Sequence, residues 1–185
     1  MRIVGDNSHA DREKGKRAVL AAVDAGYTLF DHADIYGGGE CESLFGEVLR
    51  ASPGLRDAIV IVGKCGIRFA GAPNDDDPTR YDFSIDHIVK SVEDSLQRLH
   101  SEQLDLLLLH RPDYLMNVDE VATAFDALRS SGKVAAFGAS NFSPSQLDLL
   151  QSAIDQPLHV NQVEINIHNI STLEDGTLDQ CQRMK

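Results

Sequence analysis

The sequence predicts an α/β protein built on a parallel sheet of about five to six strands. Segments with helically spaced apolar residues alternate with short apolar runs along the chain, as in repeated βα units. The run at residues 58–63 shows no alternation of apolar and polar positions, which is typical of a strand buried on both faces. Both a doubly wound sheet and a (β/α) barrel have this order. No Gly-x-Gly-x-x-Gly follows the first strand, so a Rossmann-type dinucleotide site is disfavoured.

The first half of the chain contains two predicted helices and two predicted strands. Glycine at position 26 and a Ser-Pro-Gly turn at 52–54 are the natural helix stops. The helices are predicted from residue 11 to about 25 and around 44–49, and the strands at 27–31 and 58–63. Residues 65–83 are rich in glycine, proline and aspartate, and their length predicts a lid or a mobile surface segment.

The second half continues the same alternation. Ser84 is a suitable N-cap for one helix, and Ser143 followed by Pro144 is typical of the start of another. Helices are predicted at 84–99, about 119–131, from 143 onward and from near Leu173, and strands at 104–110, 134–139 and 159–163.

Composition limits the possible partners. The 185 residues are 42% apolar and 25% charged, which is ordinary for a globular domain. A net charge of −12 argues against nucleic acid and anionic membrane surfaces, although a local site can still bind an anionic cofactor. Three widely spaced cysteines, no signal-peptide pattern and no apolar run of membrane-spanning length lead us to expect a cytoplasmic protein.

Polar residues stand at the carboxyl end of nearly every predicted strand. They are Asp31, Lys64, His110, Ser140 with Asn141, and Gln162, and Tyr36 follows the first of these ends after five positions. In a barrel the carboxyl ends of the strands meet at one mouth, so these scattered residues are expected to form one site.

The residue types at that site suit proton delivery to a carbonyl oxygen. A phenol such as Tyr36 has an ordinary pKa near 10, and a neighbouring lysine ammonium favours its phenolate form. Asp31 would keep Lys64 charged and aimed, and His110 would orient a substrate oxygen. No serine or cysteine nucleophile lies next to a base, so the attacking group is expected to be a hydride from a cofactor. Ser140, Asn141 and Gln162 are the types needed to hold a carboxamide.

Each of these residues also has a structural interpretation. Lys64 could be a solvated loop lysine, His110 a buried structural histidine, and Ser140-Asn141 a helix cap. Three further polar residues lie near the strand ends: His32, Asp34 and Asp113. Each is explained equally well as a turn former and as a participant in the chemistry. A metal-dependent barrel hydrolase is a further alternative, but no His-x-His spacing supports it, and no metal site is predicted.

Five motifs in order resemble those of the aldo/keto reductases, and most of all those of a bacterial branch of that family. They are Asp-His-Ala-Asp-Ile-Tyr-Gly at 31–37, Gly-Lys-Cys at 63–65, Leu-Leu-Leu-His-Arg-Pro-Asp at 107–113, Gly-Ala-Ser-Asn-Phe at 138–142 and Asn-Gln-Val-Glu at 161–164. The resemblance covers about residues 15–180. It implies a catalytic tetrad of Asp31, Tyr36, Lys64 and His110, with nicotinamide contacts at Ser140, Asn141 and Gln162. It also implies NADPH as cofactor and an aldehyde or ketone as substrate.

The same resemblance implies an incomplete barrel. A family member has eight βα units, whereas residues 1–185 supply too few strands for the last units, and residues 1–4 would be a remnant of the first strand. The adenosine end of NADPH would be bound by the missing part. We therefore expect one domain, a partial TIM (β/α)8 barrel, that self-associates through its open sheet edges. A non-catalytic interaction or regulatory relic of a reductase is the alternative to an active enzyme.

Overall fold

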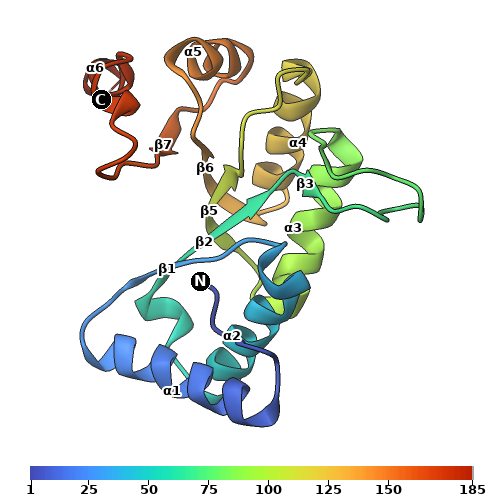
Figure 1. Cartoon of the computed structure of the whole chain (residues 1–185), viewed down its shortest axis with the longest axis vertical. Helices are drawn as coiled ribbons and strands as arrows, with labels where there is room; N and C mark the ends of the chain where they lie inside the picture. The colour runs from blue at the N-terminus through green and yellow to red at the C-terminus, as the bar shows by residue number, and fades with distance from the viewer. Residues whose placement is uncertain (185) are drawn as a thin grey trace.

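The sheet is parallel and has five strands in a curved row. The computed structural model describes residues 1–184, and the strand order across the sheet is β1-β2-β5-β6-β7 (Figure 1). The strands are β1 (Leu29–Asp31), β2 (Val60–Cys65), β5 (Leu104–Leu109), β6 (Val134–Ser140) and β7 (Leu158–Gln162). Each neighbouring pair is parallel, so all five carboxyl ends lie at the same edge of the sheet. The arrangement is half of a (β/α) barrel, in agreement with the predicted fold class.

Helices connect the strands and lie along the outside of the row (Figure 1). They are α1 (His9–Asp24), α2 (Glu40–Ala51), α3 (Ile85–Leu99), α4 (Val118–Ser130), α5 (Pro144–Ala153) and α6 (Thr177–Arg183). Ser84 caps α3, and Ser143 forms a capping box with Gln146 at the start of α5, as the sequence predicts. No helix within residues 1–184 is long and apolar enough to cross a bilayer.

The core lies between the sheet and the helices. Phe125 of α4 stacks on Phe137 of β6 with ring centroids 4.1 Å apart, and Ile88 and Leu99 of α3 are fully buried. Burial of these side chains holds the sheet rigid, so the residues at the strand ends have fixed positions.

Four local predictions need correction. The segment expected as a lid contains a short antiparallel hairpin, β3 (Ile67–Arg68) with β4 (Arg80–Tyr81), because the arms of a long loop can pair with each other. The second strand runs two residues further than predicted, which places Lys64 inside β2. Residues 1–4 form no strand, and a 3-10 helix (Ser171–Leu173) stands where a helix was expected to begin, with α6 following it.

Both edges of the described sheet are open. Within residues 1–184, β1 pairs only with β2, and β7 pairs only with β6. Apolar side chains are exposed at or beside these edges: Leu29 is 56% exposed, Val160 38% and Ile167 90%. Unpaired parallel edges with apolar neighbours are templates for pairing with another chain.

We therefore expect the 185-residue polypeptide to self-associate. In sedimentation velocity, the fraction of species larger than a monomer should grow as the protein concentration rises. Val160→Lys on the edge strand β7 should reduce that fraction. Leu149→Lys is the matched control, because Leu149 is an exposed apolar residue of α5 and does not lie on either edge strand. A single monomeric species at all concentrations would contradict the expectation.

Candidate active site

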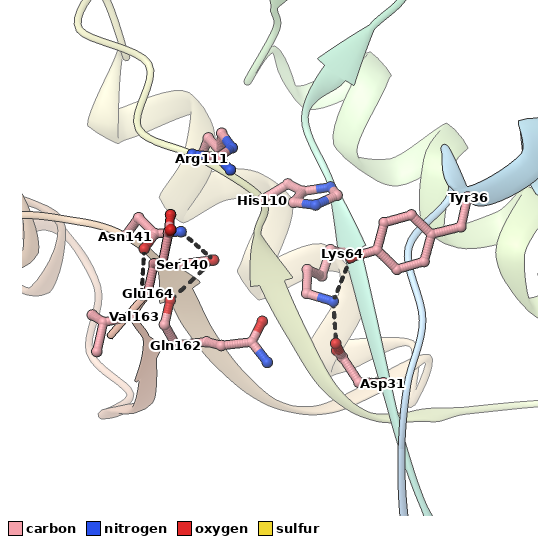
Figure 2. Close-up of a pocket in the computed structure, with 10 residues that line it drawn as sticks. All are labelled: Asp31, Tyr36, Lys64, His110, Arg111, Ser140, Asn141, Gln162, Val163 and Glu164. Carbon is pink, nitrogen blue, oxygen red and sulfur yellow. Dashed lines mark hydrogen bonds and ion pairs between the residues drawn. The ribbon is translucent and has the colours of Figure 1, made fainter. Parts of the chain in front are cut away.

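A cavity opens at the carboxyl ends of the strands, and its lining contains every residue that the sequence singled out. Its volume is about 400 Å³. The lining side chains, drawn in Figure 2, are Asp31, Tyr36, Lys64, His110, Arg111, Ser140, Asn141, Gln162, Val163 and Glu164. The parallel sheet brings these residues together because each follows, or ends, a strand whose carboxyl end faces the cavity.

Lys64 is the buried centre of this site. Its side chain is only 2% exposed, and its Nζ lies 2.5 Å from Asp31 Oδ1 and 2.9 Å from the backbone oxygen of His32. A buried ammonium is stable only when acceptors satisfy its three donors. The carboxylate and the carbonyl fill two of them and aim the third toward Tyr36. Lys64 is therefore held in one position and is not the solvated loop lysine of the alternative interpretation.

Tyr36 begins the 3-10 helix Tyr36–Gly39 that follows β1. Its Oη lies 3.5 Å from Lys64 Nζ, a long contact that can shorten when a ligand binds. Its ring lies edge-on to the His110 ring, with centroids 5.7 Å apart, and the Arg2 guanidinium lies 5.1 Å from its centroid. The phenol thus stands between an ammonium and an imidazole at the cavity wall.

His110 follows β5 and is held in its neutral form. Burial, the largest cause, and the nearby positive charges of Lys64 and Arg111 together lower its pKa to about 4. Its Nδ1 is buried without a partner among residues 1–184, so Nε2 is the ring nitrogen available to the cavity. A neutral imidazole at pH 7 can donate one hydrogen bond without adding a second cation beside Lys64.

The three polar residues at the ends of β6 and β7 are not equivalent. Asn141 Nδ2 donates to Ser140 Oγ at 3.2 Å, Ser140 Oγ donates to the Gln162 backbone oxygen at 3.0 Å, and Asn141 Oδ1 accepts from the Glu164 amide at 2.8 Å. These bonds brace the turn between the strands, and Asn141 has φ +57°. The Gln162 side chain, in contrast, extends toward the middle of the cavity and makes no hydrogen bond within the described residues (Figure 2).

The sequence reasoning missed three lining residues, Arg111, Val163 and Glu164. Each lies one or two positions after a residue that was selected, so a search extended past each strand end would have found them. The Arg111 guanidinium makes no ion pair within residues 1–184, although it lines this cavity and a neighbouring one of about 320 Å³.

His32, which the sequence left open between a turn former and a chemical group, is a core residue. It is fully buried, and its ring lies edge-on to Phe45 with centroids 4.5 Å apart. Burial lowers its pKa to about 3, helped by the positive charges of the N-terminus and Lys64. It is neutral at pH 7, and its function is packing.

A parallel half-barrel whose polar side chains gather at the carboxyl ends of the strands defines a (β/α)-barrel enzyme class. Comparison with known proteins makes this specific. The chain matches the aldo/keto reductase family over residues 1–183, and it belongs to that family.

Individual relatives agree with this assignment. The chain is 52% identical to oxidoreductase YdhF of Escherichia coli over 163 residues, which are 88% of this chain and 54% of that protein. It resembles the structure of the glycerol dehydrogenase AKR11B4 from Gluconobacter oxydans with a TM-score of 0.83 and 32% identity, covering 96% of this chain and 52% of that one. An aldo/keto reductase from Klebsiella pneumoniae, solved in complex with NADP and acetate, matches with a TM-score of 0.78 and 27% identity, covering 96% and 56%. The chain spans about half the length of the curated relatives it matches.

Proposed function

We propose that this member of the aldo/keto reductases is an NADPH-dependent oxidoreductase that reduces an aldehyde or ketone to an alcohol. The observation that carries the proposal is the chain of contacts from Asp31 to Lys64 to Tyr36, which ends in a cavity facing His110. Such a chain delivers a proton to an oxygen atom in that cavity and has no nucleophile for acyl transfer.

The roles follow from the geometry. Reduction adds a hydride to the carbonyl carbon and a proton to the oxygen, and NADPH, when bound, supplies the hydride. Tyr36 donates the proton from Oη. Lys64, 3.5 Å away, stabilises the negative charge left on the phenol, and Asp31 keeps that ammonium charged and aimed. His110 donates a hydrogen bond to the carbonyl oxygen and fixes its direction.

The cavity suits the nicotinamide end of the cofactor. Gln162 presents an amide with both a donor and an acceptor, which matches the carboxamide of nicotinamide, and the braced Ser140-Asn141 turn lies beside it. A volume of about 400 Å³ is in the range of small-molecule sites. The NADP complex of the Klebsiella pneumoniae relative supports this choice of cofactor.

The second candidate is a non-catalytic interaction or regulatory protein. It is favoured by two observations: the chain spans about half the length of the curated relatives it matches, and both edges of the sheet are open within residues 1–184. Such a protein would keep the tetrad geometry without binding NADPH.

Cofactor titration separates the two candidates. We expect NADPH fluorescence to change saturably as the protein is added, and 4-nitrobenzaldehyde then to be reduced with loss of NADPH absorbance. Gln162→Ala should weaken NADPH binding about fivefold, because the carboxamide loses a hydrogen-bonding partner. Gln97→Ala, on the exposed face of α3, is the matched control and should leave binding unchanged. Absence of binding at high micromolar NADPH would favour the non-catalytic candidate.

A further inference from the structure

Asp34, which the sequence left open between a turn former and a chemical group, lies in the Tyr36 turn and ties it to two other elements. Its backbone amide donates to the Lys64 carbonyl at 3.1 Å, and its Oδ2 accepts from Ser91 Oγ of α3 at 2.6 Å. The Tyr36 amide, two residues on, donates to the Ala33 carbonyl at 3.1 Å, which closes the turn. The turn that carries the phenol is therefore fixed both to the end of β2 and to the side of α3.

A buried ion pair supports the other end of the same segment. Arg98 of α3 donates to Glu42 of α2 through Nε at 2.8 Å and lies 2.7 Å from the carboxylate through Nη2, and Glu42 has no exposed side-chain surface. Gly39 ends the 3-10 helix with φ +93°, and a Cβ there would lie 2.8 Å from Arg98 Cδ. Only glycine allows this close approach. The segment from Asp34 to Gly39 is thus held against α3 at both ends.

The titratable groups facing Asp34 come from three elements. The charged groups are Glu42 of α2 and Arg98 of α3, and the third element, β2, contributes the neutral Cys65 thiol, whose pKa burial raises. The pKa of Asp34 is raised to about 6 as a net result: burial and the charge of Glu42 raise it, while the Ser91 hydrogen bond and Arg98 oppose the rise. Asp34 Oδ1 is buried and unpartnered among the described residues. An ionised Asp34 accepts a charge-assisted bond from Ser91, and a protonated one holds Ser91 less strongly.

We propose that Asp34 is a positioning residue for Tyr36. Its hydrogen bond with Ser91 sets the position of the phenol relative to Lys64 and His110. Asp34 does not line the cavity, so it acts through the turn and touches no substrate. The proposal rests on the proton-donor role of Tyr36 in the proposed function. According to the proposal, the reaction rate also depends on the protonation of Asp34, a buried carboxylate outside the tetrad.

The first test compares Asp34→Ala with Asp34→Asn at pH 7.5. Asp34→Ala removes the acceptor for Ser91 and should lower kcat about tenfold to a hundredfold, because a small misplacement of a catalytic group has effects of that size. NADPH affinity should stay within about twofold, because Asp34 lies outside the cavity. Asp34→Asn keeps a neutral acceptor oxygen, like the protonated carboxyl, and should therefore recover only part of the loss. Asp86→Asn, at an exposed position in the first turn of α3, is the matched control.

The second test is the pH profile of kcat, which a purely structural role would not change. In the unmodified protein kcat should fall as the pH drops through about 6 and Asp34 becomes protonated. Asp34→Asn should remove that component and stay at the lower level. Ser91→Ala should move the midpoint to higher pH, because the Ser91 bond lowers the Asp34 pKa. The α-amino group of Met1 also has a pKa lowered to about 6, so only the component lost in Asp34→Asn is assigned to Asp34.

A measurement without turnover separates this proposal from the proposed function. The ring carbons of Tyr36 can be followed by NMR with ¹³C-labelled tyrosine and assigned by their loss in Tyr36→Phe. Their shifts should follow pH through about 6 in the unmodified protein and lose that component in Asp34→Asn. If this holds while no variant reduces an aldehyde, the proposed function fails and the positioning role stands. If Asp34→Asn and Ser91→Ala leave both the rate profile and the Tyr36 resonances unchanged, the positioning role is wrong, even if Asp34→Ala does not fold.

Discussion

Tyr36→Phe is expected to lower carbonyl reduction by at least about a hundredfold, because it removes only the hydroxyl that donates the proton. General acid catalysis by a positioned side chain contributes about 10²–10⁴-fold to a rate. The phenyl ring can keep its edge-on contact with His110, so the cavity should keep its shape. NADPH affinity should therefore change by less than about twofold, and the loss should appear in kcat.

Steady-state kinetics with 4-nitrobenzaldehyde and a fluorescence titration of NADPH check both parts of this prediction. Tyr27→Phe is the matched control, because Tyr27 is 67% exposed and precedes β1 at the opposite end of the strand from the cavity. Unchanged turnover in Tyr36→Phe would overturn the assignment of the proton donor. Loss of NADPH binding would instead assign Tyr36 to the cofactor.

Arg98→Met is expected to give the largest loss of stability, about 3–5 kcal/mol of unfolding free energy, because it leaves a buried carboxylate without its partner. Glu42 has no exposed side-chain surface, and Arg98 supplies its ion pair. Burial already raises the Glu42 pKa, and Arg98 opposes that rise, so the Glu42 pKa should be higher still in Arg98→Met. A carboxyl whose pKa is raised in the folded state destabilises the fold as the pH rises through that range. The deficit should consequently be smaller at pH 5 than at pH 8.

Urea unfolding followed by circular dichroism at the two pH values measures this deficit. Lys90→Met is the matched control on the same helix, because the Lys90–Asp94 pair is exposed, with 74% and 41% of the two side chains accessible. Removing an exposed pair of this kind changes stability by less than about 1 kcal/mol. Adding Glu42→Gln to Arg98→Met should restore part of the loss, since the uncompensated charge is then gone. Equal unfolding free energies for Arg98→Met and Lys90→Met would show that the buried pair contributes no more to stability than the exposed one.

The order of helices and strands along the chain was sufficient to predict where the site residues lie. Regular alternation of helix and strand predicts parallel strands, and parallel strands place every carboxyl end at one edge of the sheet. For this reason the sequence alone predicts that Asp31, Lys64 and His110, which are far apart in the chain, line one cavity, as they do in the structure. The predicted limits of β1 and β2 differ from the observed limits by about two residues, because local propensity marks the end of a strand only weakly.

Burial and the detailed contacts of the site could not be predicted in this way. His32 and Asp34 were left open between turn formers and chemical groups. His32 fills the core beside Phe45, and Asp34, which does lie in a turn, also binds Ser91, 57 positions away in the sequence. The sequence also did not predict that the Asn141 side chain is held by hydrogen bonds while the Gln162 amide has none within the described residues.

Periodicity and local motifs were sufficient to predict the family, the parallel α/β architecture and seven of the residues that line the cavity, because these properties are recorded in short stretches of the chain. The tertiary structure decided which polar groups are buried, which hydrogen bonds they make and how far their pKa values move. Those properties depend on neighbours that α2 and α3 bring to the Tyr36 turn from distant parts of the chain, and no local pattern records them.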